Sequence, residues 1–289
     1  MNKIETLKSR PKPFLKWAGS KKWLIPHIKK FIPQSFNKYY EPFLGSGALF
    51  FALKPTRARL SDISQNLINT YIALREQPDE IIKRLKSMPY KNKFYYWVRD
   101  EYKPTSDAGK AARIIYLNRT CWNGLYRENR SGKFNVPIGR FENPKICDED
   151  NLRAVALALK NVNLRVCDFE EAVTKAKEND FIFFDPPYIT GHRNNGFHSY
   201  NEKLFRWEDQ ERLAETAGEL DRKGCYVLIT NASNEAIEKL YDGFEIVLTS
   251  RHSVIAADVH KRGLVDELII TNYHPRDYSE LLKEERRYA

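Results

Sequence analysis

Residues 181–188 read Phe-Ile-Phe-Phe-Asp-Pro-Pro-Tyr, an apolar run that ends in an acid, two prolines and an aromatic ring. The apolar run Phe181–Phe184 predicts a buried strand. Open α/β sheets bind their ligands beyond the carboxyl ends of their strands. The tetrad Asp185–Tyr188 is therefore suited to hold a flat group that carries an amine. An ordinary strand-to-loop turn is the alternative, because proline and aspartate are both common in turns.

The composition limits the classes of protein to which the chain can belong. Its 289 residues are 42% hydrophobic and include 16 Phe and 16 Tyr, which fits a folded globular protein with one large core or two smaller ones. The 48 basic residues exceed the 38 acidic ones by 10, which favours a polyanionic partner such as nucleic acid. An anionic membrane surface or simple solubility would also suit that charge.

The sequence carries no sign of secretion, of a membrane span or of a metal site. No apolar h-region follows Met1, and no apolar run reaches the roughly 18 residues that a spanning helix needs. The four cysteines, at positions 121, 147, 167 and 225, form no Cys-x-x-Cys pair. We therefore expect a cytoplasmic protein with neither a zinc site nor a disulfide framework.

Strand and helix patterns alternate at both ends of the chain, and the middle is mainly helical. This alternation predicts an α/β fold whose parallel sheet carries helices on both faces. In the middle, segment 119–145 is loop-rich and basic, and Ser131-Gly132 favours a hairpin turn within it. The predicted strands are 39–43, 59–61, 162–166, 181–184, 225–230, 244–248 and 264–271. The predicted helices are 20–31 (with Pro26 kinking or shortening it), 48–53, 65–86, 91–102, 108–118, 152–160, 169–177, 208–223 and 236–240.

A glycine-rich turn follows the first predicted strand. Glu41-Pro42-Phe43-Leu44-Gly45-Ser46-Gly47-Ala48 joins a strand to a helix start through a Gly-x-Gly turn, in which the backbone can approach a ligand closely. The third glycine of the dinucleotide fingerprint is replaced by Phe50, so the turn favours adenosine without a pyrophosphate. Any tight strand-to-helix turn remains the alternative.

Two acids lie at the ends of other predicted strands. Asp62 follows the glycine turn by 17 residues, a spacing that suits a carboxylate accepting both ribose hydroxyls. Asp168 and Phe169 could accept an amine hydrogen bond and cover an adenine face. For each acid the alternative role is a helix N-cap, and Phe169 could equally be a core residue.

The stretch Phe14–Lys21 places an aromatic ring, a small-residue turn and a lysine before a predicted helix start. Lys21 and the helix N–H groups could donate to a carboxylate there, although a flexible basic arm is the alternative. Together with the glycine turn and the two acids, this segment describes a ligand with adenine, ribose and an amino-acid end, which is S-adenosylmethionine.

Six stretches of the chain stand out together: FLKWAGSK (14–21), EPFLGSGALFF (41–51), LSDISQNLI (60–68), LNRTCWNGLYRENRSGKFNVPIGRF (117–141), FFDPPY (183–188) and VDELIITNY (265–273). They resemble the Dam-type family (class alpha, D12) of DNA adenine N6-methyltransferases. The resemblance implies a Rossmann-like methyltransferase sheet, mostly parallel with an antiparallel last strand, and an inserted, mainly helical DNA-recognition domain. It assigns residues 1–64 and 148–289 to the catalytic domain that binds S-adenosylmethionine, and 65–147 to target recognition.

By this resemblance the tetrad is the catalytic motif, with Asp185, Pro186, Pro187 and Tyr188 as catalytic residues. The Asp185 carboxylate and the Pro186 carbonyl would accept the two hydrogens of the adenine amine and free its lone pair to attack. Tyr188 would stack on the base, which must be flipped out of the duplex. The sulfonium of the donor already activates the methyl group, so positioning and electrostatics suffice without a metal.

The resemblance also assigns binding residues. Those for the cofactor are Trp17, Ala18, Gly19, Lys21, Glu41, Pro42, Phe43, Gly45, Gly47, Asp62, Asp168, Phe169 and Asp185. Those for DNA are Arg119, Trp122, Asn123, Leu125, Arg127, Lys133, Pro137, Arg140, Phe197 and Tyr200. Among these, Arg127 is the candidate for bidentate reading of a guanine edge.

The expected function is site-specific methylation of adenine N6 in double-stranded DNA, in a short palindrome such as GATC. The chain would act in restriction-modification, beside a separate cognate endonuclease, or as a solitary methylase. We expect a monomer or weak dimer that associates with the nucleoid and with no membrane. The alternatives are another amine acceptor (cytosine N4, RNA adenine or a protein glutamine) and a non-catalytic DNA-binding regulator.

Overall fold

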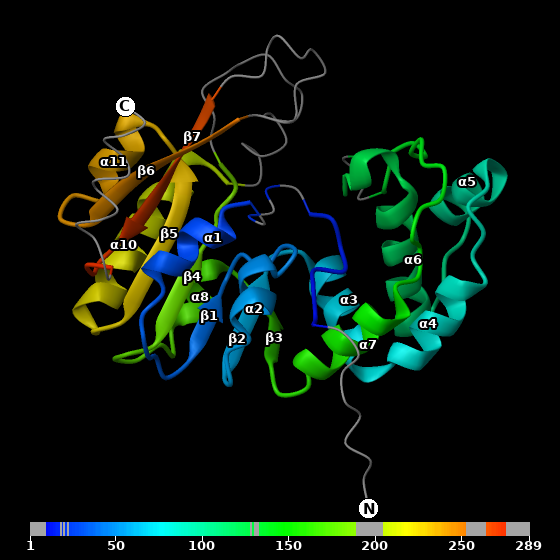
Figure 1. Cartoon of the computed structure of the whole chain (residues 1–289), viewed down its shortest axis with the longest axis horizontal. Coiled ribbons are helices and arrows are strands. Elements are labelled where there is room, and N and C mark those ends of the chain that lie inside the picture. Colours follow the sequence, from blue (N-terminus) through cyan, green and yellow to red (C-terminus); the bar gives the residue numbers. More distant parts are fainter. Residues whose placement is uncertain are drawn as a thin grey trace, which may run out of the picture. The chain divides into compact units, whose positions relative to one another are not determined.

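A single mixed sheet organises the fold. The computed structural model describes residues 10–17, 19, 21, 23–127, 129, 133–188, 205–252 and 264–275. Within them, seven strands form a sheet in the order β3-β2-β1-β4-β5-β7-β6 (Figure 1). The strands are β1 (Tyr39–Glu41), β2 (Ala58–Asp62), β3 (Asn163–Val166), β4 (Phe181–Phe184), β5 (Tyr226–Ala232), β6 (Glu245–His252) and β7 (Leu264–Thr271).

The strand directions confirm the predicted fold class. β4 runs parallel to both β1 and β5, whereas β7 lies between β5 and β6 and is antiparallel to each. A mostly parallel sheet that ends in an antiparallel last strand is the Rossmann-like arrangement that the sequence predicts. Because parallel strands share one direction, the carboxyl ends of β1, β4 and β5 lie at the same edge.

The chain divides into two compact units. Unit 1 comprises residues 1–22, 44–56 and 60–166, and unit 2 comprises 23–43, 57–59 and 167–289. The predicted division into a catalytic domain (1–64 and 148–289) and a recognition domain (65–147) is one of function, and it stays a prediction.

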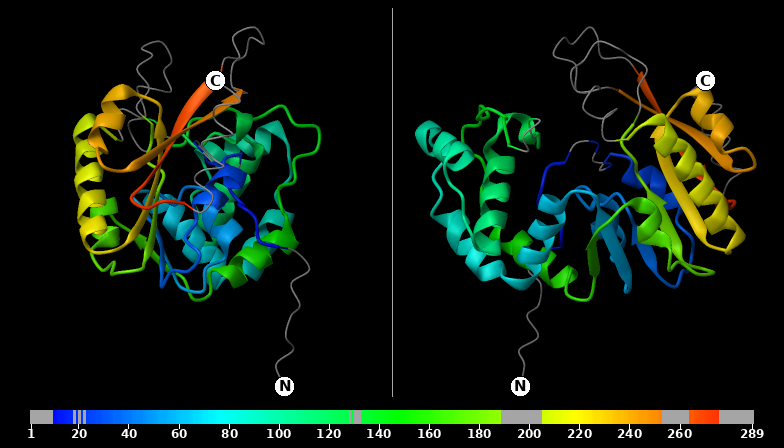
Figure 2. Two further views of the ribbon diagram at one scale, coloured as in Figure 1. Left: turned by 60° about the vertical axis from the view of Figure 1, so that its left-hand side comes forward. Right: turned by 180° about the vertical axis from the view of Figure 1, so that it is seen from behind.

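Unit 2 is built around β1 and β4–β7. Its main core lies between these strands and the helices α8 (Phe169–Val173), α10 (Trp207–Arg222) and α11 (Glu235–Leu240), as Figure 2 shows for α10 and α11. Alternation along each strand divides the side chains between two faces. Tyr40 and Ile182 join this core, whereas Tyr39 and Phe181 contact each other on the opposite face. Phe36 contacts both of these rings. Before β1 the chain forms α1 (Ile25–Ile28) and η1 (Lys29–Phe31), and the Phe31 carbonyl accepts the Tyr273 hydroxyl.

Unit 1 is mainly helical. Its longest described helix is α6 (Asp107–Thr120), which packs against α3 (Gln65–Glu76), α4 (Pro78–Lys86) and α5 (Asn92–Asp100). Two of these helices begin with side-chain caps: Ser64 accepts the Leu67 N–H at α3, and Ser106 accepts the Gly109 N–H at α6. The remaining helical elements of the unit are α2 (Ala48–Leu53), η2 (Trp122–Gly124) and α7 (Glu149–Ala158).

Two predicted helices are wrong in extent, and proline explains both. The helix predicted over 65–86 breaks at Gln77, because Pro78 has no N–H to continue α3 and instead starts α4. The helix predicted over 20–31 is only α1 followed by η1, since Pro26 occupies the first turn of α1. The predicted cap Ser20 lies outside the described residues.

Smaller differences concern element ends and the predicted hairpin. The strand predicted over 39–43 ends at Glu41, and the helix predicted over 169–177 ends at Val173. Around the predicted turn, Asn129 N–H donates to the Lys133 carbonyl and Asn135 N–H to the Arg127 carbonyl, although neither flank is a regular strand. None of the helices in the described part of the chain has both the length and the hydropathy needed to cross a bilayer.

Candidate active site

The glycine turn of unit 1 requires its glycines. Gly45 and Gly47 have φ of 47° and 64°, and Gly47 caps the start of α2. A Cβ on Gly45 would lie 3.1 Å from Cδ1 of Trp17, and the Tyr71 hydroxyl donates to the Gly45 carbonyl over 3.2 Å. The left-handed backbone and the close indole therefore exclude a side chain at this turn.

Asp62 is fixed to this turn by backbone donors. Its Oδ2 accepts the Gly45 N–H over 3.1 Å, and its Oδ1 accepts the Ser64 N–H over 2.9 Å. The capping role considered for Asp62 belongs to Ser64, which caps α3. Desolvation by the surrounding protein raises the pKa of Asp62, and the backbone hydrogen bonds oppose that rise. The carboxylate is thus partly desolvated and aimed by main-chain geometry.

The N-terminal segment of unit 1 is joined to the basic loop segment. Trp17 stacks on Tyr126, with ring centroids 4.9 Å apart and planes 22° apart. Next to it, the buried Asn118 accepts the Lys16 N–H over 2.7 Å and donates to the carbonyls of Lys16 (2.7 Å) and Gly124 (3.1 Å). The segment around Trp17 and the loop after α6 are therefore held as one piece.

Lys21 differs from a flexible basic arm, because its side chain is buried. Its Nζ donates to the Gly19 carbonyl over 3.1 Å. Its predicted role toward a carboxylate stays a prediction, and Ala18 lies outside the described residues.

In unit 2, both ends of the tetrad are tied to neighbouring strands. The Thr230 hydroxyl of β5 donates to Asp185 Oδ1 over 2.8 Å. The Tyr188 hydroxyl donates to Glu267 Oε2 of β7, also over 2.8 Å. Burial, followed by the negative charges of Asp185 and Glu267, raises the pKa of Tyr188 well above its ordinary value. Tyr188 is therefore a neutral phenol across the physiological pH range.

The residues after β1 form a second part of the site in unit 2. Glu41 is buried and accepts the Tyr39 hydroxyl over 2.9 Å, and burial together with this carboxylate raises the pKa of Tyr39. Phe43 stacks on Phe169 with centroids 5.5 Å apart and planes 27° apart. Phe205 meets both rings edge-on or tilted. Pro42, between Glu41 and Phe43, is buried.

Asp168 is the N-cap of α8, the alternative role that the sequence suggested for this acid. Its Oδ1 accepts the Glu170 N–H at the start of α8 over 3.0 Å and the Arg212 Nη2–H over 2.9 Å. Arg212 also pairs with Glu170 and Asp209 and lies over the Phe169 ring, with Cζ 4.9 Å from its centroid. Both bonds end on one carboxylate oxygen, so capping is compatible with a role of the other oxygen in cofactor binding.

Backbone hydrogen bonds hold the loop after α6, and several of its side chains are exposed. Trp122 N–H donates to the Pro137 carbonyl and Gly139 N–H to the Thr120 carbonyl, beside an isolated bridge between Cys121 and Ile138. Asn123 is held at φ 53°, in the left-handed region. The Trp122 side chain is 51% exposed. Leu125 is half-buried, and Pro137 is exposed.

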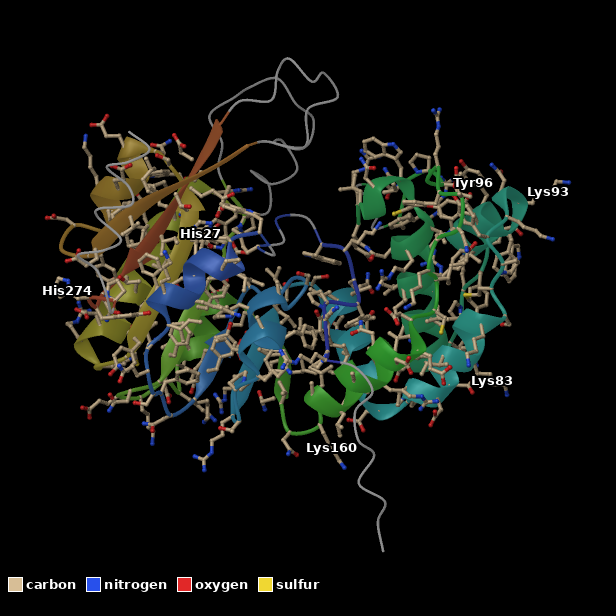
Figure 3. The ribbon with its side chains drawn as sticks, in the orientation of Figure 1. His27, Lys83, Lys93, Tyr96, Lys160 and His274 are labelled. Atoms are coloured by element: carbon tan, nitrogen blue, oxygen red, sulfur yellow. The ribbon has the colours of Figure 1, made fainter. Side chains whose placement is uncertain are left out.

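The predicted basic contacts differ in their surroundings. Arg127 is exposed and its Nε donates to Asn135 Oδ1 over 2.9 Å, while Lys133 and Arg140 are exposed. Arg119 is half-buried, and desolvation lowers its pKa while Asp148 opposes that shift. Unit 1 carries further exposed lysines, of which Figure 3 labels Lys83, Lys93 and Lys160. Phe197 and Tyr200 lie outside the described residues.

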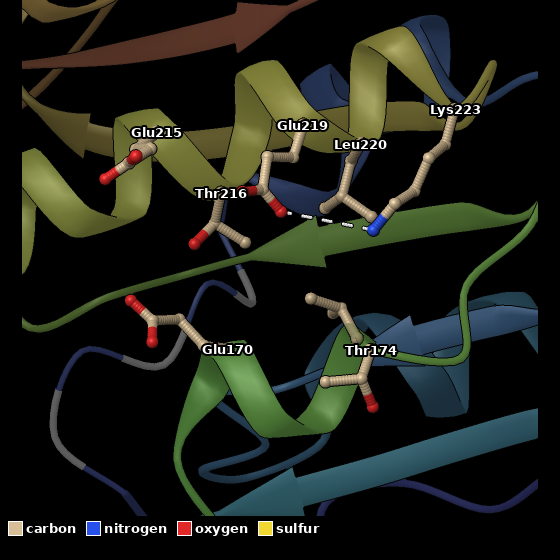
Figure 4. Close-up of a pocket in the computed structure, with 8 residues that line it drawn as sticks. Glu170, Thr174, Glu215, Thr216, Glu219, Leu220 and Lys223 are labelled. Atoms are coloured by element: carbon tan, nitrogen blue, oxygen red, sulfur yellow. Dashed lines mark ion pairs between the residues drawn. The ribbon is translucent and has the colours of Figure 1, made fainter.

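A surface groove of about 360 Å³ lies between α8 and α10 (Figure 4). Glu170, Glu215 and Glu219 line it, and Glu219 is paired with Lys223. None of the predicted site residues lines this groove, and its acidic lining is unsuited to DNA.

Several residues that hold the site were missed by the sequence reasoning: Thr230, Glu267, Arg212, Asn118 and Tyr126. Glu267 could have been noticed in the sequence, because it is an acid directly before the apolar run Leu268–Ile270 of a predicted strand. The sequence did not single out the other four residues, since a threonine, an asparagine, an arginine or a tyrosine is ordinary at these positions.

Comparison with known proteins identifies relatives over nearly the whole chain. Residues 17–255 match the family described as D12 class N6 adenine-specific DNA methyltransferase. A type II methyltransferase of Lactococcus lactis subsp. cremoris is 38% identical, covering 94% of this chain and 99% of the relative. A type II methyltransferase of Methanocaldococcus jannaschii is 37% identical, with coverages of 91% and 99%. The DNA adenine methylase of Escherichia coli is 31% identical, with coverages of 89% and 93%.

The family match covers most of the chain and includes the glycine turn, both strand-end acids and the tetrad. The chain therefore belongs to the D12 class of N6 adenine-specific DNA methyltransferases and is an adenine-specific DNA methyltransferase.

Proposed function

We propose that this protein transfers a methyl group from S-adenosylmethionine to N6 of a flipped adenine within a short palindromic site of duplex DNA. The observation that carries the proposal is the Asp185 carboxylate, which follows β4 directly and is oriented by Thr230. A carboxylate fixed in this way can orient an amine without carrying out any covalent chemistry itself.

The residues of unit 1 fit the cofactor. The turn at Gly45 has no space for a side chain and exposes backbone, and Asp62 beside it presents an acceptor for ribose hydroxyls. In unit 2, Asp168 is a candidate acceptor for the adenine amine of the cofactor. When bound, S-adenosylmethionine supplies a methyl group on a positive sulfonium, which needs no further activation.

The tetrad prepares the attacking amine. The Asp185 carboxylate and the Pro186 carbonyl accept the two amine hydrogens, which favours a pyramidal nitrogen with its lone pair free. Tyr188, neutral and anchored through its hydroxyl, offers its ring for stacking on the base. These groups act through position and charge, the means by which enzymes accelerate a direct displacement.

The loop after α6 is the proposed target-reading surface. Its backbone hydrogen bonds hold Trp122 and Asn123 at exposed positions, where they can contact or wedge the target site. Arg127 is exposed and preoriented by Asn135, as bidentate reading of a guanine requires. Lys133 and Arg140 would contact phosphates. We propose GATC as the recognition sequence, by likeness of this segment to the Dam-type enzymes.

Single-molecule sequencing of DNA from a host that lacks adenine methylation tests the proposal in one step. Cells that express the chain should carry N6-methyladenine in one short palindrome, and cells that express the Asp185→Ala variant should not. Methylation of cytosine N4 would favour the alternative acceptor. Unmodified DNA that the purified protein nevertheless binds would favour a non-catalytic regulator. The type II names of two relatives favour a role in restriction-modification.

A further inference from the structure

We infer that Thr230 and Glu267 are positioning residues that lock the two ends of the catalytic tetrad from neighbouring strands. This inference rests on the proposed function, because it assigns these residues a role in the methyl transfer step. Neither residue needs to contact the substrate, because each acts through a residue of the tetrad.

Thr230 controls the orientation of the catalytic acid. It is fully buried, and its hydroxyl donates to Asp185 Oδ1 over 2.8 Å. The same hydroxyl lies 3.5 Å from the Phe184 carbonyl, a longer contact than the one to Asp185. Asp185 is half-buried, so the loss of this donor weakens the compensation for its desolvation and favours another side-chain orientation. Thr230 therefore selects the rotamer in which Asp185 can meet an amine.

Glu267 fixes the position of Tyr188, the last residue of the tetrad. Its side chain is 3% exposed, and Oε2 accepts the Tyr188 hydroxyl over 2.8 Å. A buried carboxylate is stable only when it is hydrogen-bonded, and the phenol supplies such a donor. With its hydroxyl fixed, the Tyr188 ring has one orientation to offer to a base.

The two residues form one platform. In the antiparallel pairing of β5 and β7, Ala232 lies opposite Glu267, so Thr230 is two residues from that register position. The end of β5 is also tied to α10, because Asn231 Nδ2 donates to Gln210 Oε1 over 2.9 Å and both side chains are fully buried. Thr230 and Glu267 thus lie on paired strands, and the end of β5 is also held by α10.

Rigid support of this kind acts on the chemical step. An interaction that improves geometry only in the transition state lowers kcat when it is removed and leaves substrate binding nearly unchanged. We therefore expect the loss of Thr230 or Glu267 to separate the rate of methyl transfer from the affinities for cofactor and DNA.

The test compares Thr230→Val, Thr230→Ser, Glu267→Leu and Glu267→Gln in the full chain. Single-turnover methylation of a duplex and the Kd values for S-adenosylmethionine and DNA are measured for each. We expect Thr230→Val and Glu267→Leu to slow transfer by about 10- to 100-fold with both Kd values within about threefold. The conservative changes Thr230→Ser and Glu267→Gln keep a donor or an acceptor and should restore most of the rate.

Thr271→Val is the matched control. Thr271 is also a buried threonine of this sheet, but its hydroxyl donates to the Tyr273 carbonyl over 2.8 Å. It should transfer methyl groups at a rate within about threefold of the wild type. If Thr271→Val slows transfer as much as Thr230→Val does, the effect is general loss of packing and the inference is overturned.

Further outcomes separate the inference from the proposed function. An active wild type with an unaffected Thr230→Val variant would overturn the inference alone. So would a rate loss that tracks an equal loss of cofactor and DNA binding, or one that Thr230→Ser does not repair. A purified wild type that methylates no adenine would overturn the proposed function, and the inference with it.

Discussion

Asp62 in unit 1 and Asp185 in unit 2 both lie at the ends of strands, yet they are held in different ways. Backbone N–H groups of Gly45 and Ser64 hold Asp62. The hydroxyl side chain of Thr230 holds Asp185. The first arrangement follows from the path of the main chain, whereas the second uses a side chain 45 residues away in the sequence. The acid proposed to bind the cofactor is thus built into the fold, and the acid proposed to orient the amine can be adjusted by one substitution.

The largest expected effect is at Asp185. Asp185→Ala removes the group that orients the amine in the transition state, so single-turnover methylation should fall by about a thousandfold or more. DNA binding, measured by titration, should stay within about tenfold of the wild type. An equal loss of binding and turnover would mean that Asp185 is a structural residue rather than a catalytic one.

A smaller and different effect is expected at Asp62. Asp62→Ala removes an ionised acceptor for two hydroxyls, so the Kd for S-adenosylmethionine should rise by about 10- to 100-fold. Transfer at saturating cofactor should remain close to the wild-type rate. Isothermal titration and single-turnover assays separate the two values. A fall in the saturated rate with unchanged cofactor affinity would reverse the roles that we assign to the two acids.

Arg127 lies outside both strand ends and sharpens the comparison by changing specificity alone. Arg127→Ala should reduce discrimination by about 1–3 kcal/mol at one base pair of the site, because it removes a bidentate contact to a base edge. Methylation rates on a set of single-mismatch duplexes give this value. Lys133→Ala is the comparison variant. A uniform loss across all sequences for Arg127→Ala would make it a phosphate contact.

The pH dependence of cofactor binding gives the smallest effect. Burial raises the pKa of Asp62, so it gains a proton at a higher pH than an ordinary aspartate does. Ribose hydroxyls donate to the ionised form. Affinity should therefore fall as the pH drops through that raised pKa, by up to about tenfold per pH unit. Titrations of wild type and Asp62→Asn between pH 4 and 7 check this, and a wild-type profile as flat as the variant's would contradict it.

The sequence predicted the parts of the site that depend on local geometry. The Gly45 turn, β4 and β7 lie where the patterns indicated, because turn glycines and apolar runs act over a few residues. Pro78 could have indicated the break between α3 and α4, but the helical periodicity on both sides of it favoured one continuous helix. Thr230 and Glu267 could not be predicted, since they reach the tetrad from strands 45 and 79 residues away.

Asn118 limits how this protein can be re-engineered. Its single amide satisfies both backbone groups of Lys16 and the carbonyl of Gly124. Aspartate at this position would lack the two N–H donors, and alanine would leave three main-chain groups unsatisfied. Chimaeras that graft a foreign reading loop onto this scaffold should therefore take the Asn118 helix end and the Lys16–Trp17 segment from the same parent.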